Sequence, residues 1–286
     1  MKSLQALIDL LTLEQIDTCL FRGQNYKTPW GRVYGGQVLG QALNAAYRTV
    51  PEDRIAHSMH GYFVLTGDIH KPIIYRVETI RDGGSFTTRR VTASQNGKPI
   101  FVMTASFQLS QPGLDHQPEK PEVLDPGKVK TDMEQADSIK EFSPALYEKV
   151  KAREQNAIVF KPIDMFSFDG TIPGNPQRKV WMKTTSPLEM SLPMQHQLLA
   201  FSSDYDLLVT ALYPHMGAVD LNKLFLASLD HAMWFHRSVD LNDWLLYVIN
   251  SPNASNSRGL GYGSIFNQAG ELVATVMQEG LMRKME

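Results

Sequence analysis

Cysteine is nearly absent from this chain. Cys19 is the only one among 286 residues, which excludes an intrachain disulfide and a metal site built from cysteines. Sparse cysteine is typical of proteins from a reducing compartment. The last residues, RKME, do not match the Ser-Lys-Leu signal for peroxisomes. We therefore expect a cytoplasmic location.

An excess of positive charge and a long apolar run are also missing. The 28 Lys and Arg residues nearly balance the 30 Asp and Glu residues, so we expect no broad basic surface and no nucleic-acid partner. No stretch approaches the ~18 apolar residues that a membrane span needs, so we expect no membrane partner. The apolar start, MKSLQALIDLL, is interrupted by Asp9 and has Lys2 as its only basic residue. These features favour an amphipathic helix over a signal peptide.

The composition changes near the middle of the chain. Residues 111–127 read QPGLDHQPEKPEVLDPG and have the proline, glycine and charge of a linker. The segment DSIKEFSPALYEKVKAREQ then has a helical pattern that Pro144 should divide. Strand-like patterns resume in AIVFKPIDMFSF and RKVWMKTT. The sequence predicts a first half over residues 1–110, a linker with a helical segment over 111–155, and a second half over 156–286.

The two halves have the same order of patterns. The hairpin pattern VTASQNGKPIFVMTASFQ turns at Gly97, and GSIFNQAGELVATVMQEG turns at Gly270. An apolar helical segment precedes the strands of each half, GGQVLGQALNAAYRTV in the first and HQLLAFSSDYDLLVTALYP in the second. His60 before GYF is predicted to correspond to His231 before AMWF. A period this long indicates duplication of a domain.

A helix followed by several long alternating strands predicts an α+β fold, in which a curved antiparallel sheet wraps round a buried helix. The segments YGGQVLGQAL, HSMHGYF, NGKPIFVMTASFQ, LDHAMWFHR and MQEGLMR resemble the acyl-CoA thioesterase II family, the TesB-like proteins of bacteria. The resemblance runs from LFRGQ to the C-terminus. It implies a double hotdog, two tandem halves each with a sheet round a central helix. It also implies a homo-oligomer, a dimer or a tetramer, because hotdog proteins pair through their sheets.

The resemblance implies an enzyme that hydrolyses fatty acyl-CoA thioesters to free fatty acid and CoA, with no cofactor and no metal. Members of the family are similar in using an acid, a hydroxyl and an amide to activate water. By motif the acid is Asp204 in FSSDYDLL, the hydroxyl is Ser228 in LASLDHAMW, and the amide is Gln278 in VMQEG. The hydroxyl residue is Thr in some members and Ser in others, so Ser228 departs from only one version of the pattern.

The residue types suit this chemistry. A thioester carbonyl has little resonance stabilisation and a thiolate leaves readily, so the reaction needs a base and an orienting hydrogen bond. Asp204 in an otherwise apolar helix should have a raised pKa, which makes it a better base. Ser228 and Gln278 could orient the water or polarise the carbonyl. Taken singly, these three could instead be a helix cap, a strand-edge hydroxyl and an exposed strand residue, with Asp206 as an alternative acid.

Other motifs give weaker alternatives. SLDH brings Ser228, Asp230 and His231 together in sequence, but triad members meet in space and the chain has no G-x-S-x-G motif. GDIHKP resembles the Asp/His motif of hotdog hydratases but lacks its Asn-Pro, and GLGYG is too short a pattern for a dinucleotide loop. His231 and His236 have no third ligand nearby, so no metal is expected. We interpret His60 and His231 as structural residues, either of which could border the acyl tunnel.

Two functions remain, an acyl-CoA hydrolase and a non-catalytic acyl-CoA-binding module. The three polar residues favour the hydrolase, since a binding module has no need of them together. Arg89, Arg90 and Arg258 are candidates for contacting the phosphates of CoA, although solvated strand positions explain them equally well.

The first half is not expected to repeat the chemistry of the second. Aligning the hairpins places Ala105 opposite Gln278, and aligning the histidines places His57 opposite Ser228. The helical segment GGQVLGQALNAAYRTV contains no acidic residue. We therefore predict one catalytic site per chain, built from the second half, with the first half as one wall of the tunnel.

Overall fold

The computed structural model of the chain describes residues 3–28, 31–137, 140, 144–151, 157–163, 176–220 and 223–285. In these residues, thirteen strands form one sheet in which every pairing is antiparallel. The strands are β1 (Glu14–Asp17), β2 (Leu20–Gly23), β3 (Ile55–Phe63), β4 (Ile73–Asp82), β5 (Phe86–Gln95), β6 (Lys98–Gln108), β7 (Ile158–Pro162), β8 (Gln177–Thr184), β9 (Leu224–Ser228), β10 (Asp230–Phe235), β11 (Leu245–Ser255), β12 (Arg258–Phe266) and β13 (Leu272–Lys284).

The order of the strands is symmetric about the pair β3–β10. It runs β1-β2-β4-β5-β6-β3-β10-β13-β12-β11-β8-β7, with β9 added beside β13. Each strand of the first half therefore has a counterpart at the same distance from the centre in the second half. This is the arrangement that a duplicated domain with continuous sheet pairing should have.

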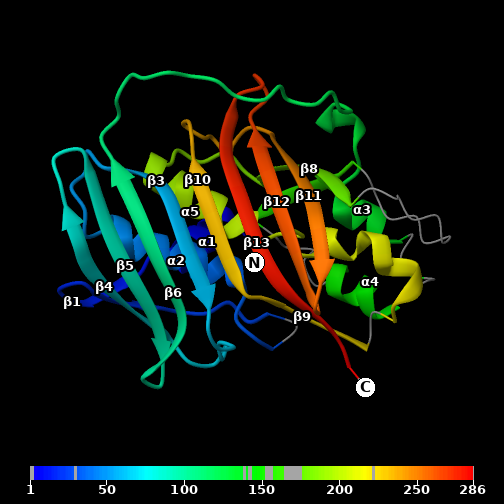
Figure 1. Ribbon diagram of the computed structural model, residues 1–286, viewed down its shortest axis with the longest axis horizontal. Helices are drawn as coiled ribbons and strands as arrows, with labels where there is room; N and C mark the ends of the chain where they lie inside the picture. The colour runs from blue at the N-terminus through cyan, green and yellow to red at the C-terminus, as the bar shows by residue number, and fades with distance from the viewer. Residues whose placement is uncertain are drawn as a thin grey trace.

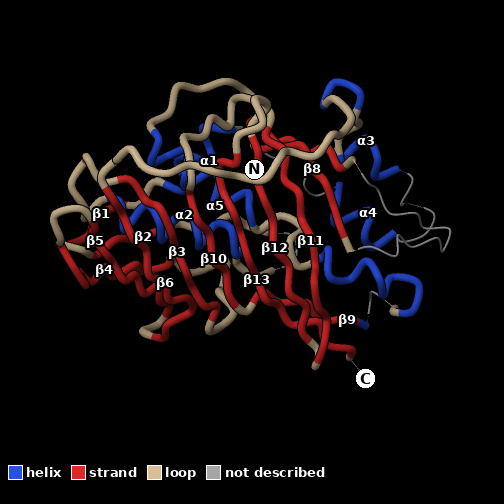
Figure 2. Tube along the Cα trace, turned by 45° about the horizontal axis from the view of Figure 1, so that its top comes forward, coloured by secondary structure: helices blue, strands red, loops and turns tan. Residues whose placement is uncertain are grey.

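Two long helices lie against one face of this sheet, α2 (Gly35–Tyr47) and α5 (Leu192–Ser203), and the sheet curves round them (Figures 1 and 2). Neither helix contains a charged Asp, Glu, Lys or Arg side chain. All residues of α2 from Gly36 to Ala46 are buried, so its sequence suits a central position with no solvated face. The short helix α1 (Leu4–Leu11) buries Leu4, Leu7 and Leu11 as its amphipathic pattern predicts.

Both predicted hairpins are confirmed. Between β5 and β6, Asn96 and Gly97 have φ angles of 51° and 73°, a left-handed pair that matches the twist of a two-residue turn. The β12–β13 connection contains Gly270, which has a φ of 92°. The hairpins occupy equivalent places on the two sides of the central pair.

The predicted long helix HQLLAFSSDYDLLVTALYP was wrong in its second part. Helix α5 ends at Ser203, and a separate 3₁₀ segment, η3 (Val209–Ala218), follows. Between them Asp206 has a φ of 55°, and its carboxylate lies 3.0 Å from a guanidinium nitrogen of the buried Arg178. Asp206 lies two residues beyond the C-cap Asp204, so its left-handed conformation keeps α5 from continuing into η3, and the ion pair holds Asp206 there.

The central segment runs from the end of β6 to the second half, across the upper ends of the central strands as Figure 1 shows them. Gln117 bonds the backbone of the β12–β13 hairpin at Gly270 and Leu272. The described residues that follow contain three short helices, η1 (Pro126–Lys128), α3 (Asp132–Ala136) and α4 (Pro144–Lys151). Pro144 is the first residue of α4, and most of the predicted helical segment before it lies outside the described residues. The predicted boundary at 155/156 lies outside the described residues, and the three domain ranges stay predictions.

Candidate active site

Asp204 lies at the junction of the two central helices. It is the C-cap residue of α5 rather than a residue inside the helix, so its carboxylate is near the negative end of that helix dipole. The start of α2 faces it from the other side, where the Gly36 N–H donates to Asp204 Oδ2 at 2.9 Å. The candidate base is therefore held by a backbone donor from the first half.

Two glycines make this contact possible. A Cβ atom on Gly35 would lie 2.7 Å from Asp204 Oδ2, and one on Gly36 would lie 2.2 Å from the carbonyl oxygen of Phe201. Side chains at these positions would displace the carboxylate or separate the helices. The glycines thus permit a close approach between the two helices.

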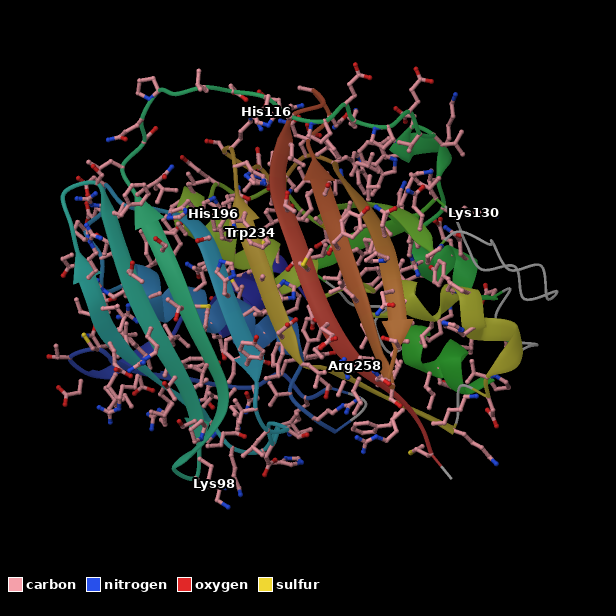
Figure 3. The ribbon with its side chains drawn as sticks, viewed as in Figure 1. Lys98, His116, Lys130, His196, Trp234 and Arg258 are labelled. Atoms are coloured by element: carbon pink, nitrogen blue, oxygen red, sulfur yellow. The ribbon has the colours of Figure 1, made fainter. Side chains whose placement is uncertain are left out.

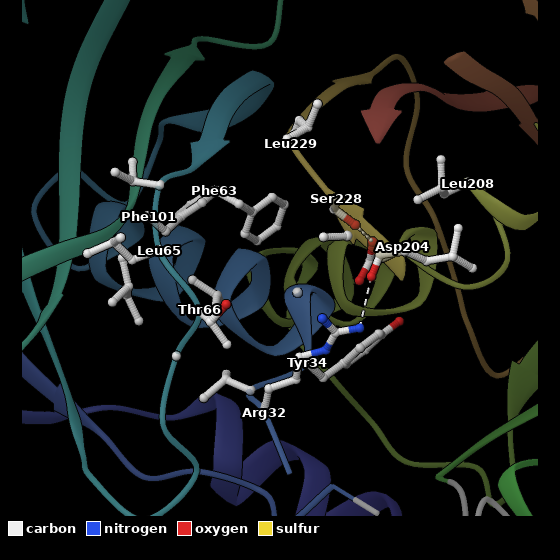
Figure 4. Close-up of a pocket in the computed structure, with 18 of the residues that line it drawn as sticks. Arg32, Tyr34, Phe63, Leu65, Thr66, Phe101, Asp204, Leu208, Ser228 and Leu229 are labelled. Atoms are coloured by element: carbon white, nitrogen blue, oxygen red, sulfur yellow. Dashed lines mark hydrogen bonds between the residues drawn. The ribbon is translucent and has the colours of Figure 1, made fainter. Parts of the chain in front are cut away.

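The structure brings all three predicted residues together. Ser228 ends β9, which pairs with β13 so that Ser228 lies opposite Gly280, two residues from Gln278. The Gln278 Nε2 amide donates to Ser228 Oγ at 2.8 Å. Ser228 Oγ lies 3.5 Å from Asp204 Oδ1, at the long limit for a hydrogen bond. The Ser228 hydroxyl is thus held by Gln278 but only loosely engaged by Asp204, and Figure 4 shows Ser228 beside Asp204.

Burial makes the Asp204 carboxyl a weak acid. Desolvation raises its pKa from 3.8 to about 7, although hydrogen bonds from Gly36, Gln278 and Ser228 each lower it in part. A carboxyl with this pKa is divided between its neutral and ionised forms near neutral pH. That is the range in which a general base accepts a proton most effectively.

A cavity of about 380 Å³ opens beside Asp204 and Ser228. Both halves contribute to its apolar wall, and Phe63, Leu65 and Phe101 of the first half lie across the cavity from the two polar residues (Figure 4). Arg32 also lines the cavity and joins the two halves, since it donates to the Leu226 carbonyl at 2.9 Å. Gln278 does not line the cavity and is only 1 % exposed. Gln278 therefore lies behind the cavity wall and contacts the two polar residues that line it, Ser228 and Asp204.

His231 was not predicted as part of the site, and the structure places it directly behind Gln278. It is fully buried, with Nδ1 2.6 Å from Gln278 Oε1 and Nε2 3.0 Å from Ser203 Oγ. The predicted match to His60 was wrong, because the exposed His60 lies on the outer face of the sheet against Trp234. Successive residues of a strand alternate between faces, so a one-residue misalignment exchanges inside for outside.

Other candidates from the sequence are not at this site. Asp230 accepts a hydrogen bond from the Glu279 N–H, so SLDH does not form a triad. Arg89 is buried and bonded to Thr49 and Asp82, which leaves it unavailable to a phosphate. In the part of the chain that the structure describes, no cluster of three or more His, Cys, Asp or Glu residues could hold a metal ion, and no helix is long and apolar enough to cross a membrane.

Comparison with known proteins agrees with this architecture. Residues 26–108 match the family model for an acyl-CoA thioesterase N-terminal domain, and residues 151–281 match that for acyl-CoA thioesterase. The chain is 41% identical over 282 residues to acyl-CoA thioesterase 2 of Haemophilus influenzae, covering 98% of each chain.

Solved structures give the same result. Acyl-CoA thioesterase II TesB2 from Mycobacterium marinum superposes with a TM-score of 0.81 and is 37% identical, over 97% of this chain and 98% of that one. A hot dog fold protein from Alicyclobacillus acidocaldarius has a TM-score of 0.77 at 18% identity, over 98% of this chain and 99% of that one, which supports the fold alone. The predicted double hotdog is confirmed, and the chain belongs to the acyl-CoA thioesterase family of thioester hydrolases.

Proposed function

We propose that the protein hydrolyses fatty acyl-CoA thioesters to free fatty acid and CoA, using a water molecule activated by Asp204. The observation that carries the proposal is a carboxyl group with a pKa of about 7 on the wall of a largely apolar cavity. The cavity suits an acyl chain, and the carboxyl suits proton transfer at the thioester that ends the chain. The names of the similar proteins support acyl-CoA as the substrate class.

In the proposed reaction, ionised Asp204 accepts a proton from water as the water oxygen attacks the thioester carbonyl. The Ser228 hydroxyl, loosely engaged by Asp204 at 3.5 Å, orients the water. The carbon–sulfur bond breaks, and CoA leaves as a thiolate that takes up the proton. Gln278 acts through Ser228, whose oxygen it holds at 2.8 Å, and through its own hydrogen bond to Asp204. A well-placed base of this kind supplies a rate gain of ~10²–10⁴.

We further propose one site per chain. The two ends of the α2–α5 pair correspond to each other because the chain is duplicated, but the end opposite to Asp204 has different residues at the corresponding positions. Counted from the first residue of each helix, α2 has Tyr47 where α5 has Asp204. The second helical position of α5 is Pro193 where α2 has Gly36, and proline has no N–H to donate.

Side chains also occupy the space at that end of the helix pair, where a second site would need a cavity. Tyr47 OH lies 2.7 Å from Nδ1 of the buried His196 and accepts from the Ala56 N–H, and His196 lies in the helix layer (Figure 3). Strand pairing places Met59 and Ala105 together in the first half as His231 and Gln278 lie together in the second. Neither Met59 nor Ala105 can supply the hydrogen bonds of the proposed site.

The alternative function, a non-catalytic acyl-CoA-binding module, is separated from hydrolysis by one assay. Release of thiol from palmitoyl-CoA should be enzymatic for the wild-type protein and at least ~10²-fold slower in kcat for Asp204→Asn, since Asn cannot accept the proton of water. Binding of a non-hydrolysable thioether analogue should be retained in the variant, with about one site per chain. A wild-type protein that binds the analogue but releases no thiol would support the binding module instead.

We also retain the proposal of a homo-oligomer. Tyr62 on β3, Tyr262 on β12 and Met277 on β13 are exposed on the sheet, at 67%, 37% and 40%. A second copy of the chain packed on this face would remove their apolar surface from water. Light scattering on the purified protein should give two or four times the chain mass of 32.2 kDa, and a single-chain mass would contradict the proposal.

A further inference from the structure

A chain of buried hydrogen bonds extends behind the proposed site, away from the cavity. It joins Ser203, His231, Gln278, Ser228 and Asp204, with separations of 3.0, 2.6, 2.8 and 3.5 Å along that order. Ser203 and His231 are fully buried and neither lines the cavity. His231 therefore acts on the site through Gln278, which bonds Ser228 and Asp204.

The distances fix which atoms of His231 and Gln278 face each other. The Gln278 amide nitrogen is directed at Ser228, so its carbonyl oxygen faces the imidazole. The 2.6 Å separation is far shorter than a contact between two nitrogen atoms and lies just below the usual 2.7–3.2 Å range of N–H···O bonds. Two acceptors would repel at this distance, so His231 Nδ1 must carry a hydrogen.

The ring has only this one hydrogen. Burial lowers the pKa of His231 to about 4, even though its bond to Gln278 raises the pKa in part, so the imidazole is neutral at working pH. His231 Nε2 is then an acceptor, and the Ser203 hydroxyl, 3.0 Å away, turns its one hydrogen to Nε2 instead of to the Ala200 carbonyl at 2.9 Å. With this tautomer, every donor in the chain points toward Asp204: Ser203 to His231, His231 to Gln278, Gln278 to Ser228, and Ser228 to Asp204.

We propose that His231 is a positioning residue, whose Nδ1–H holds the Gln278 amide in the orientation that directs the Ser228 hydroxyl to Asp204. The inference rests on the proposed function, since it assigns the direction of hydrogen bonding at the same site. It explains why the second half has the buried His231 at the position that corresponds to Met59 in the first half.

The other tautomer of His231 would reverse the direction of every hydrogen bond in the chain. With the hydrogen on Nε2, His231 would donate to Ser203 Oγ, and Ser203 would donate to the Ala200 carbonyl 2.9 Å away. Nδ1 would then accept, so the amide would turn by half a rotation and its oxygen would accept the Ser228 hydrogen. Asp204 would lose the Ser228 hydroxyl, and the water would lose its orienting group.

Two substitutions distinguish positioning from packing. His231→Asn places a carboxamide near the original Nδ1 and keeps a donor for Gln278 Oε1, whereas His231→Gln places its carboxamide near Nε2. We expect His231→Gln to lower kcat by ~10-fold or more with KM changed less than ~3-fold, because it leaves the buried Gln278 oxygen unpaired. His231→Asn should restore most of kcat. A purely structural role predicts the reverse, because the smaller Asn leaves the larger cavity.

His60 provides the matched control. It is exposed on the neighbouring strand, at the position that pairs with Ala232, and His60→Asn and His60→Gln should both retain wild-type kcat. If the two His231 variants have equal kcat, or if Asn is the worse, the inference is wrong.

The tautomer of His231 in the unmodified protein gives a second test that does not depend on activity. Long-range proton–nitrogen spectra of the ¹⁵N-histidine-labelled protein should show a neutral ring with its hydrogen on Nδ1. A ring with hydrogen on Nε2, or a protonated ring, would overturn the inference even if both variants failed to fold. The proposed function is tested apart from this result by Asp204→Asn: wild-type turnover in that variant refutes the function, whereas an inactive Asp204→Asn with the Nε2 tautomer refutes only the role of His231.

Discussion

The raised pKa of Asp204 has a stability consequence that the variant Asp204→Asn should reveal. The carboxyl has a pKa of about 7 in the folded protein against 3.8 as an ordinary side chain. The folded state therefore binds a proton more tightly than the unfolded state. The contribution of Asp204 to the free energy of unfolding is therefore most favourable below pH ~4. It falls as the pH rises from ~4 to ~7 and is constant above that range.

The size of the effect follows from the two pKa values. A difference of about 3 units at about 1.4 kcal/mol each gives at most ~4 kcal/mol, the penalty for ionising Asp204 in the folded protein at pH 8. At pH 5 the penalty is only ~2 kcal/mol, because it grows with the interval between the pH and 3.8, the pKa of the unfolded side chain. Asn is neutral at every pH and can still accept the Gly36 N–H. Asp204→Asn should thus be more stable than wild type, by roughly twice as much at pH 8 as at pH 5.

Urea unfolding of both proteins at pH 5 and pH 8 measures this difference, with activity measured on the same samples. Asp206→Asn is the control, since Asp206 pairs with the buried Arg178 and its loss should destabilise the protein at pH 8 by ~3 kcal/mol. A stability gap between wild type and Asp204→Asn that does not change between the two pH values would refute the reasoning. So would an Asp204→Asn protein that is less stable than wild type at pH 8.

Further predictions concern the same site. The kcat/KM of wild type should rise with pH through an apparent pKa near 7 and then level off, because Asp204 must be ionised to act as a base; a rate that does not change between pH 5 and pH 8 would exclude Asp204 as that base. Ser228→Thr should keep kcat within a few-fold while Ser228→Ala loses ~10-fold or more, and equal rates would show that the hydroxyl does not orient water. Gly35→Ala should lower kcat by ~10-fold or more because its Cβ would lie 2.7 Å from Asp204 Oδ2, whereas Gly84→Ala, with open space around it, should have no effect.

Local patterns in the sequence predicted the two hairpins and the two central helices. These features follow from residue spacing and from turn residues such as Gly97 and Gly270, which act within a few positions. The end of α5 at Ser203 was not predictable in this way. It depends on Asp206 meeting Arg178, a residue 28 positions earlier in the chain, and the apolar pattern continues through the break.

The candidate site shows the same division. Asp204, Ser228 and Gln278 could be named from motifs, but Gly36 contributes only a backbone N–H and leaves no chemical signal in its side chain. His231 was visible, yet a one-residue alignment error paired it with the outward-facing His60 and concealed its contact with Gln278. Only the register of β3 against β10, in which Ala232 rather than His231 pairs with His60, shows which face each histidine occupies.

The central claim is that Asp204 activates water as a base and forms no bond to the acyl group. A single turnover in oxygen-18 water, with the enzyme in excess over palmitoyl-CoA, tests this claim directly. Direct attack by water should place one oxygen-18 atom in the fatty acid and none in the Asp204 side chain, as measured by mass spectrometry of the product and of the peptide that contains Asp204. Oxygen-18 in the Asp204 carboxyl would reveal an anhydride between the enzyme and the acyl group, and it would contradict the account.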